Sequence, residues 1–211
     1  MTRNLAIGLL AAAVSLGAAS RAQATSFVIG GVTYETTATS ENLAATFTTP
    51  DGGVTSNTYN GLVEIIVSGT GESAGTDLND AFYIYSPPQD AGADPNYYQL
   101  TNDDMTLAAF NPPQDEKNFI VYDVDAGMEV SPPYVPAYRP DHTYSFIVDT
   151  SLFGVVSPEA LHFGVSDGDF ADNSGQYNIE VTQLDPVPEP ASLVLLGTGL
   201  IGVARRRLRK K

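Results

Sequence analysis

The 211-residue chain has no cysteine, no tryptophan and few cations. Without cysteine there is no disulfide framework, no thiol nucleophile and no Cys-ligated zinc. The stability of the fold must therefore come from a packed core. The interior segment, residues 25–190, is long enough for one domain with a sizeable core and too short to favour two.

Cations are nearly missing from this interior segment. Lys117 and Arg139 are its only Lys and Arg residues, whereas all 25 acidic residues fall inside it, so its formal charge is 2 minus 25, or −23, against −15 for the whole chain. Nucleic acid and anionic lipid are bound through cation patches, so this imbalance argues against both as partners. It favours divalent cations, or acidity that only keeps an exported protein soluble.

The N-terminal 24 residues have the pattern of a secretory signal peptide. Arg3 supplies the positive start, residues 5–16 form an apolar run, and Ala22-Gln23-Ala24 fits a cleavage site. An ordinary buried helix is the alternative, but it would need a polar face that this run lacks. The pattern predicts export, with the mature chain starting at Thr25.

The C-terminal segment, residues 187–211, combines three features in order. Pro188-Glu189-Pro190 precedes an uncharged apolar run at 191–204, and Arg205, Arg206 and Arg207 open a basic tail. Cations after an apolar run keep that end of a membrane segment in the cytoplasm. As a helix the run reaches only ~21 Å, against ~30 Å of hydrocarbon. The short span favours a temporary transmembrane helix before processing over a permanent tail anchor.

This segment resembles the PEP-CTERM sorting signal. The resemblance implies that a membrane-embedded exosortase recognises the signal, cuts near Pro188-Glu189-Pro190 and passes the upstream domain to the outside. It also implies a final location at the cell surface or outside the cell. Extracellular polysaccharide would be the natural partner there.

The interior segment has the sequence pattern of an all-β domain. Alternating apolar and polar residues predict strands at 61–69, 142–149 and 176–183, and further strands are expected at 27–35, 43–48, 81–85, 97–101, 105–110, 118–123 and 161–166. Nine or ten strands imply two packed sheets. We therefore predict a two-sheet β-sandwich of jelly-roll type over residues 25–186, between an N-terminal signal helix and a C-terminal transmembrane helix.

A candidate metal site lies at residues 167–175. The stretch combines Asp167, Asp169, Asp172 and Asn173 with glycines that allow a tight turn. Oxygen ligands at this density suit Ca²⁺, although the spacing does not fit an EF-hand. The alternative is a hydrogen-bonded Asx turn without metal.

The same stretch, together with Asn79-Asp80-Ala81-Phe82, is similar to jelly-roll calcium-dependent galactose-binding lectins of bacteria. The resemblance implies calcium ligation by the side chains of Asp167, Asp172 and Asn173 and by the backbone carbonyl of Asp169. It also implies sugar binding through the metal. The missing tryptophan and the short loop at 69–76 argue more strongly against the sugar than against the metal.

Catalytic motifs are not found. There is no Gly-x-Ser-x-Gly elbow or His-Glu-x-x-His pair, and His142 and His162 fall at or within predicted strands. We therefore expect a non-catalytic structural or adhesive protein of the cell surface or extracellular matrix. The alternatives are a calcium-dependent carbohydrate-binding module and a glycan hydrolase that uses two carboxylates.

Overall fold

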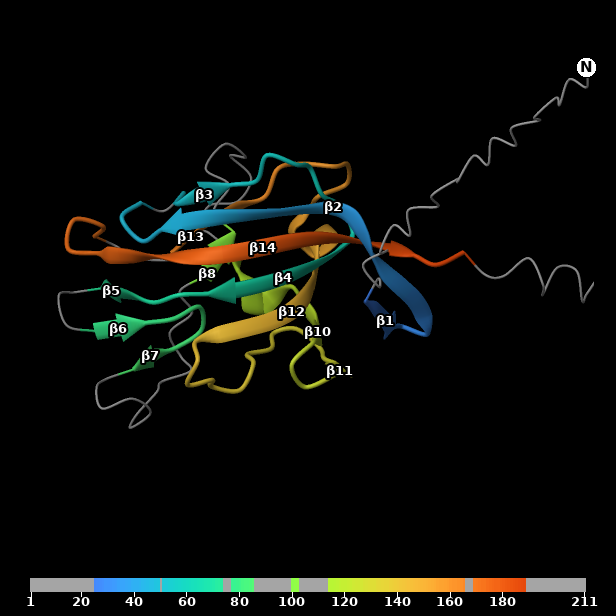
Figure 1. Cartoon of the computed structure of the whole chain (residues 1–211), viewed down its shortest axis with the longest axis horizontal. Coiled ribbons are helices and arrows are strands. Elements are labelled where there is room, and N and C mark those ends of the chain that lie inside the picture. The colour runs from blue at the N-terminus through green and yellow to red at the C-terminus, as the bar shows by residue number, and fades with distance from the viewer. Residues whose placement is uncertain are drawn as a thin grey trace, which may run out of the picture.

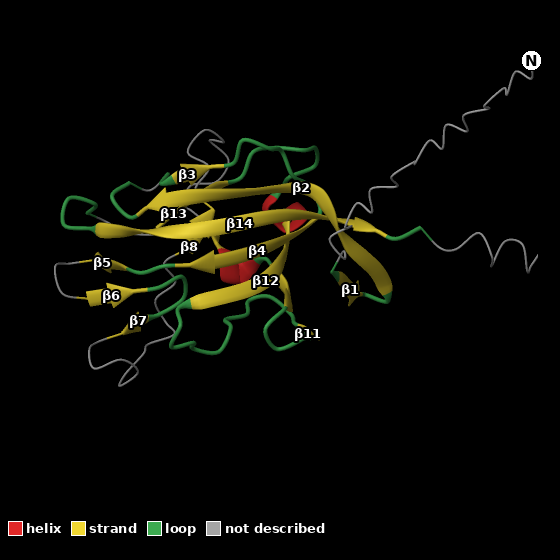
Figure 2. Ribbon diagram, in the orientation of Figure 1, coloured by secondary structure: helices red, strands yellow, loops and turns green. Residues whose placement is uncertain are grey.

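A computed structural model describes residues 25–49, 51–73, 77–85, 100–102, 114–165 and 169–188. These residues form fourteen strands and two short 3-10 helices. The predicted all-β class is thereby confirmed, as Figure 2 shows. No helix within these residues has the length and apolar character needed to cross a membrane. The predicted signal helix and C-terminal transmembrane helix lie outside them.

The larger sheet contains ten strands, all paired antiparallel (Figure 1). Its long central strand β14 (Ser174–Pro186) lies between β2 (Val32–Thr46) and β4 (Leu62–Ser68). Beyond β4 follow β12 (Thr143–Asp149), β10 (Ile120–Asp123) and β11 (Met128–Glu129). At one end β5 (Gly71–Ser73), β6 (Asp77–Asn79) and β7 (Ile84–Tyr85) continue the sheet, and at the other β1 (Ser26–Ile29) pairs with β2.

The smaller sheet has four strands in the order β3 (Gly53–Val54), β13 (His162–Val165), β8 (Leu100–Asn102) and β9 (Gln114–Asp115). Backbone hydrogen bonds connect the two sheets at one corner, where Thr46 N donates to Gly52 O and Gly52 N donates to Phe163 O. The 3-10 helices η1 (Glu116–Asn118) and η2 (Thr150–Phe153) each adjoin a strand.

The core lies on one face of the large sheet. Strands β4, β12 and β14 each turn three alternating apolar side chains inward, all at most 2% exposed: Val63, Ile65, Val67, Tyr144, Phe146, Val148, Tyr177, Ile179 and Val181. Phe163 and Val165 of β13 join the same cluster. Each such burial stabilises the fold by about 1.5–3 kcal/mol. The period-2 pattern thus correctly predicted the three central strands.

Three of the predicted strands have wrong boundaries. The expected strand at 27–35 is broken at Gly30 and Gly31, whose φ angles of 59° and 79° form a hairpin turn. The strand expected at 43–48 is the end of the continuous strand β2. In the expected strand at 81–85, only Ile84 and Tyr85 are in strand conformation. The strand expected at 105–110 lies outside the described residues.

Candidate functional site

The end of β14 is held by β2 until one residue before the sequence motif at 188–190. Pro186 pairs with Tyr34, and Val187 N donates to Thr33 O at 2.8 Å. Because the pairing is antiparallel, β14 runs toward the Gly30 end of β2. The folded domain therefore ends immediately before Pro188, beside the tip of the β1–β2 hairpin, as Figure 1 shows at the end of β14.

The hairpin tip, which we define as residues 28–32, has apolar side chains on both faces. Ile29 pairs with Val32 on the face that carries Phe27, and Val28 lies on the opposite face. Val28 is 54% exposed and Val32 is 43% exposed. The tip is fixed to the sheet through Gly30 N, which donates to the carboxylate of Glu129 on β11 at 3.1 Å.

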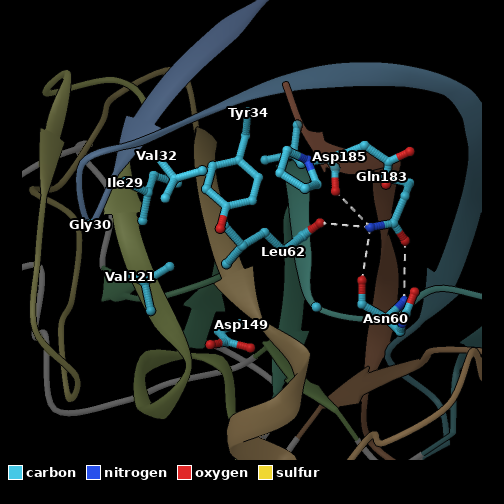
Figure 3. Close-up of a pocket in the computed structure, with 13 residues that line it drawn as sticks. Ile29, Gly30, Val32, Tyr34, Asn60, Leu62, Val121, Asp149, Gln183 and Asp185 are labelled. Carbon is cyan, nitrogen blue, oxygen red and sulfur yellow. Dashed lines mark hydrogen bonds between the residues drawn. The ribbon is translucent and has the colours of Figure 1, made fainter. Parts of the chain in front are cut away.

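A groove of about 580 Å³ lies between the hairpin and the outer face of the large sheet (Figure 3). Its lining is mainly aliphatic on the hairpin side and polar at the β14 side: Ile29, Gly30, Val32, Tyr34, Asn60, Gly61, Leu62, Val121, Asp149, Gln183, Leu184, Asp185 and Pro186. The base of the hairpin is packed down, because Phe27, Ile147 and Leu184 form a small buried cluster there. The groove thus opens at the tip and is closed at the base.

Gln183 stabilises the polar wall of this groove through side-chain hydrogen bonds. Its Nε2 donates to Asn60 O at 2.8 Å and to Leu62 O at 3.0 Å, and its Oε1 accepts from Asn60 N at 3.1 Å (Figure 3). Asp149 is occupied too, since its Oδ1 accepts from Ser151 N and Ser151 Oγ at the start of η2. These contacts make the groove a shaped surface with fixed polar walls.

A second polar cluster is centred on Asp80, which is fully buried. Its Oδ1 accepts from Phe82 N and Tyr83 N, and its Oδ2 lies 2.8 Å from Tyr144 Oη and 2.9 Å from His142 Nδ1. Tyr177 Oη donates to the backbone carbonyl of Asp80. The carboxylate therefore joins the turn before β7 to the start of β12, and the backbone carbonyl of Asp80 joins the same turn to β14.

Three tyrosines near buried carboxylates have raised pKa values: Tyr144 and Tyr177 lie near Asp80, and Tyr134 lies near Asp123. Burial, followed by the charge of Asp80, raises the pKa of Tyr144, and the same two causes raise that of Tyr177. Burial and the hydrogen bond to Asp123 raise the pKa of Tyr134 to about 12. All three phenols therefore stay protonated at neutral pH and act as hydrogen-bond donors.

The predicted metal ligands are only partly described, because Asp167 lies outside the described residues. Asp169 is exposed and its Oδ1 accepts from Ala171 N, which is the hydrogen bond of an Asx turn. Asp172 is exposed as well. Asn173 points inward: its Nδ2 donates to Phe47 O, whereas its buried Oδ1 has no hydrogen-bond partner among the residues that the structure describes. Within the described ranges, no group of three or more His, Asp or Glu residues could hold a metal ion.

Sequence reasoning missed both the hairpin tip and the Asp80 cluster. The tip could have been found, because Gly30-Gly31 between apolar residues is a two-residue hairpin signal. The cluster could not, since His142 and Tyr144 are 62 and 64 residues from Asp80 in the chain. Only the tertiary fold brings these side chains together.

Comparison with known proteins identifies the segment that follows β14. Structure and sequence together define an all-β domain whose last strand leads directly into a terminal signal. Residues 186–210 match the family model of the PEP-CTERM protein-sorting motif. The chain is thus an exported protein that is sorted by an exosortase and anchored in the membrane before processing. Neither the curated proteins nor the solved structures contain a match to the chain.

Proposed function

We propose that the exported domain is a non-catalytic structural or adhesive component of the cell surface or extracellular matrix, with a jelly-roll body. The observation that carries this proposal is the Asp80 cluster. The described residues contain a buried Asp–His contact, but all four hydrogen bonds to the Asp80 carboxylate come from groups of the fold itself. A buried carboxylate with four such hydrogen bonds links separate parts of the domain, which supports a structural role.

The charge of the domain supports an extracellular polymer as the partner. Arg139, one of its two cations, is paired with Asp125 at 3.3 Å and with Asp141 at 3.2 Å. The surface is therefore strongly acidic, and divalent cations would bridge it to acidic polysaccharide. Deleting the gene for this protein is expected to weaken cell aggregation, and a secreted full chain is expected to restore it. Unchanged aggregation in the deletion strain would contradict the adhesive role.

Calcium-dependent carbohydrate binding is a second candidate, favoured by Asn173. Its buried Oδ1 accepts no hydrogen bond from the described part of the chain, and leaving such an oxygen unsatisfied costs about 1–3 kcal/mol. Asn173, Asp172, Asp167 and the carbonyl of Asp169 would hold the ion, which would supply coordination sites for sugar hydroxyls.

Thermal unfolding with calcium and with EDTA tests this candidate. Calcium at ~100 times its dissociation constant adds ~2.7 kcal/mol of stability. We expect Asp172→Asn to remove the stabilisation and Glu180→Gln, an exposed acid on β14, to keep it. Equal melting of the wild type in both solutions would eliminate the calcium site. A glycan array then tests sugar binding, and turnover of any arrayed glycan would favour the hydrolase alternative.

A further inference from the structure

The folded domain lies unusually close to the segment that the processing enzyme must read. Val187 still donates a backbone hydrogen bond to Thr33, and the motif begins at Pro188. The apolar run begins at Ala191, four residues after Val187, which is at most ~14 Å of extended chain. No spacer separates the last paired residue from the motif.

The size of a protein interface decides whether an enzyme can bind this motif without contacting the domain. A standard interface buries about 800 Å² on each partner, which corresponds to a disc of ~16 Å radius. A disc of that size centred on Pro188, the first residue of the motif, includes the strand end and the neighbouring turn of the hairpin, since β14 runs toward Gly30 and Gly31. The hairpin tip must therefore either take part in the contact or obstruct it.

The surface of the tip is suited to taking part. The described residues have six large apolar side chains that are strongly exposed, and the tip carries two of them, Val28 and Val32, one on each face. A third, Met128, adjoins Glu129, whose carboxylate accepts the hydrogen bond from Gly30. The groove beside Val32 adds a concave region to this apolar surface.

The surrounding charges distinguish a protein partner from the bilayer surface. Glu129 contacts the tip at Gly30, Glu35 and Asp185 pair with each other at the base of the same hairpin, and the sequence has no Lys or Arg between Arg21 and Lys117. Anionic headgroups would repel such a surface, because membrane contact uses cationic residues. A protein with an apolar patch and neighbouring cations would be complementary to it.

We propose that the β1–β2 hairpin tip is a docking surface for the membrane-embedded enzyme that processes the sorting signal. Val28 and Val32 provide its apolar contacts, and the hydrogen bond from Val187 to Thr33 fixes the distance between this surface and the motif. The enzyme thus recognises a folded feature together with the linear signal. The proposal rests on the sorting motif and is independent of the adhesive role.

Photo-crosslinking in cells that contain the enzyme tests the contact directly. A diazirine amino acid is placed at position 28 or 32 of the full chain, and at Val156, which is 92% exposed, as the control. Adducts with the enzyme are expected from positions 28 and 32 only. Adducts with lipid in their place, or no adduct with the enzyme, would overturn the proposal.

Processing kinetics provide a second readout. Val28→Glu combined with Val32→Glu is expected to slow conversion of the precursor by about tenfold, the effect of losing one strong apolar anchor, whereas Val156→Glu leaves the rate unchanged. An equal thermal stability of the double variant excludes misfolding as the cause. A ten-residue Gly/Ser insertion after Val187 should remove the crosslinks from position 32.

Three outcomes separate failure of the docking surface from failure of the sorting itself. Normal processing of the double variant, or crosslinks that persist after the insertion, refute docking and leave sorting intact. If the double variant is less stable than the wild type, the crosslinks alone test the docking surface. If the wild-type precursor is never processed, both the sorting and the docking surface are refuted.

Discussion

The hydrogen bond between Tyr144 and Asp80 offers a sharp test of the buried cluster. Tyr144→Phe removes the hydroxyl that donates to Asp80 Oδ2 at 2.8 Å and accepts a longer bond of 3.4 Å from Arg139 N; the ring and the other three hydrogen bonds to Asp80 stay in place. Both side chains are fully buried. A hydrogen bond to a charged group contributes about 1.5–3 kcal/mol, and 1 kcal/mol shifts Tm by ~2–4 °C in a domain of this size. Tm should therefore fall by about 3–12 °C.

Urea unfolding of matched variants measures this effect. Tyr122→Phe is the control, because its half-buried ring contacts Phe27 while its hydroxyl forms no hydrogen bond with the described residues. Asp80→Asn should cost about 1–3 kcal/mol, since its NH2 group would replace one of the two accepting oxygens. Combined with Tyr144→Phe it should cost less than the sum of the two changes. A Tyr144→Phe variant within about 0.5 kcal/mol of wild type would refute the role of the cluster.

Three further predictions concern backbone space and pH. Gly175→Ala should cost about 3 kcal/mol or more in urea unfolding, because its Cβ would lie 2.5 Å from a backbone carbon at a φ of 100°, whereas Gly127→Ala, with open space around it, should cost about 1–2 kcal/mol. Burial and the charge of Glu180 raise the pKa of Glu64 above its usual 4.5, so the ionised carboxylate at pH 7 destabilises the folded state. Glu64→Gln removes this charge and should therefore raise Tm at pH 7, but not at pH 3, where the acid is protonated. The pKa of Tyr134, raised to about 12, gives a contribution to stability that is complete below pH 10 and lost as the pH rises through about 12; in thermal unfolding, Tyr134→Phe should make that loss less steep.

Local sequence patterns predicted the centre of the fold and missed its edges. The apolar alternation at Val63, Ile65 and Val67 is sufficient to specify a strand with one buried face, and the structure has that strand. At the edges of the sheet, burial of apolar side chains no longer determines where a strand begins and ends. Strand β2 continues through polar residues because it pairs with both β1 and β14. Such pairing over long chain distances leaves no periodic pattern in β2 itself.

The candidate sites show the same limit. The sorting motif was found from sequence because the signal is linear and is read as sequence. The hairpin tip acquires its position only because Val187 pairs with Thr33, far away in the chain. Asn173 was predicted as an oxygen ligand from composition, but its amide orientation is set by the carbonyl of Phe47 in the turn after β2. The calcium site therefore stays a prediction.

The central position of β14 has a consequence for the order of events during translocation. With the predicted signal peptide the chain would emerge N-terminus first, and its last strand fills the gap between β2 and β4 in the sheet. The sheet cannot close until residue 186 has crossed, because until then β2 and β4 lack the neighbour that they share. Translocation is thus nearly complete before the domain can fold, and the apolar run enters the membrane just as the last strand becomes available.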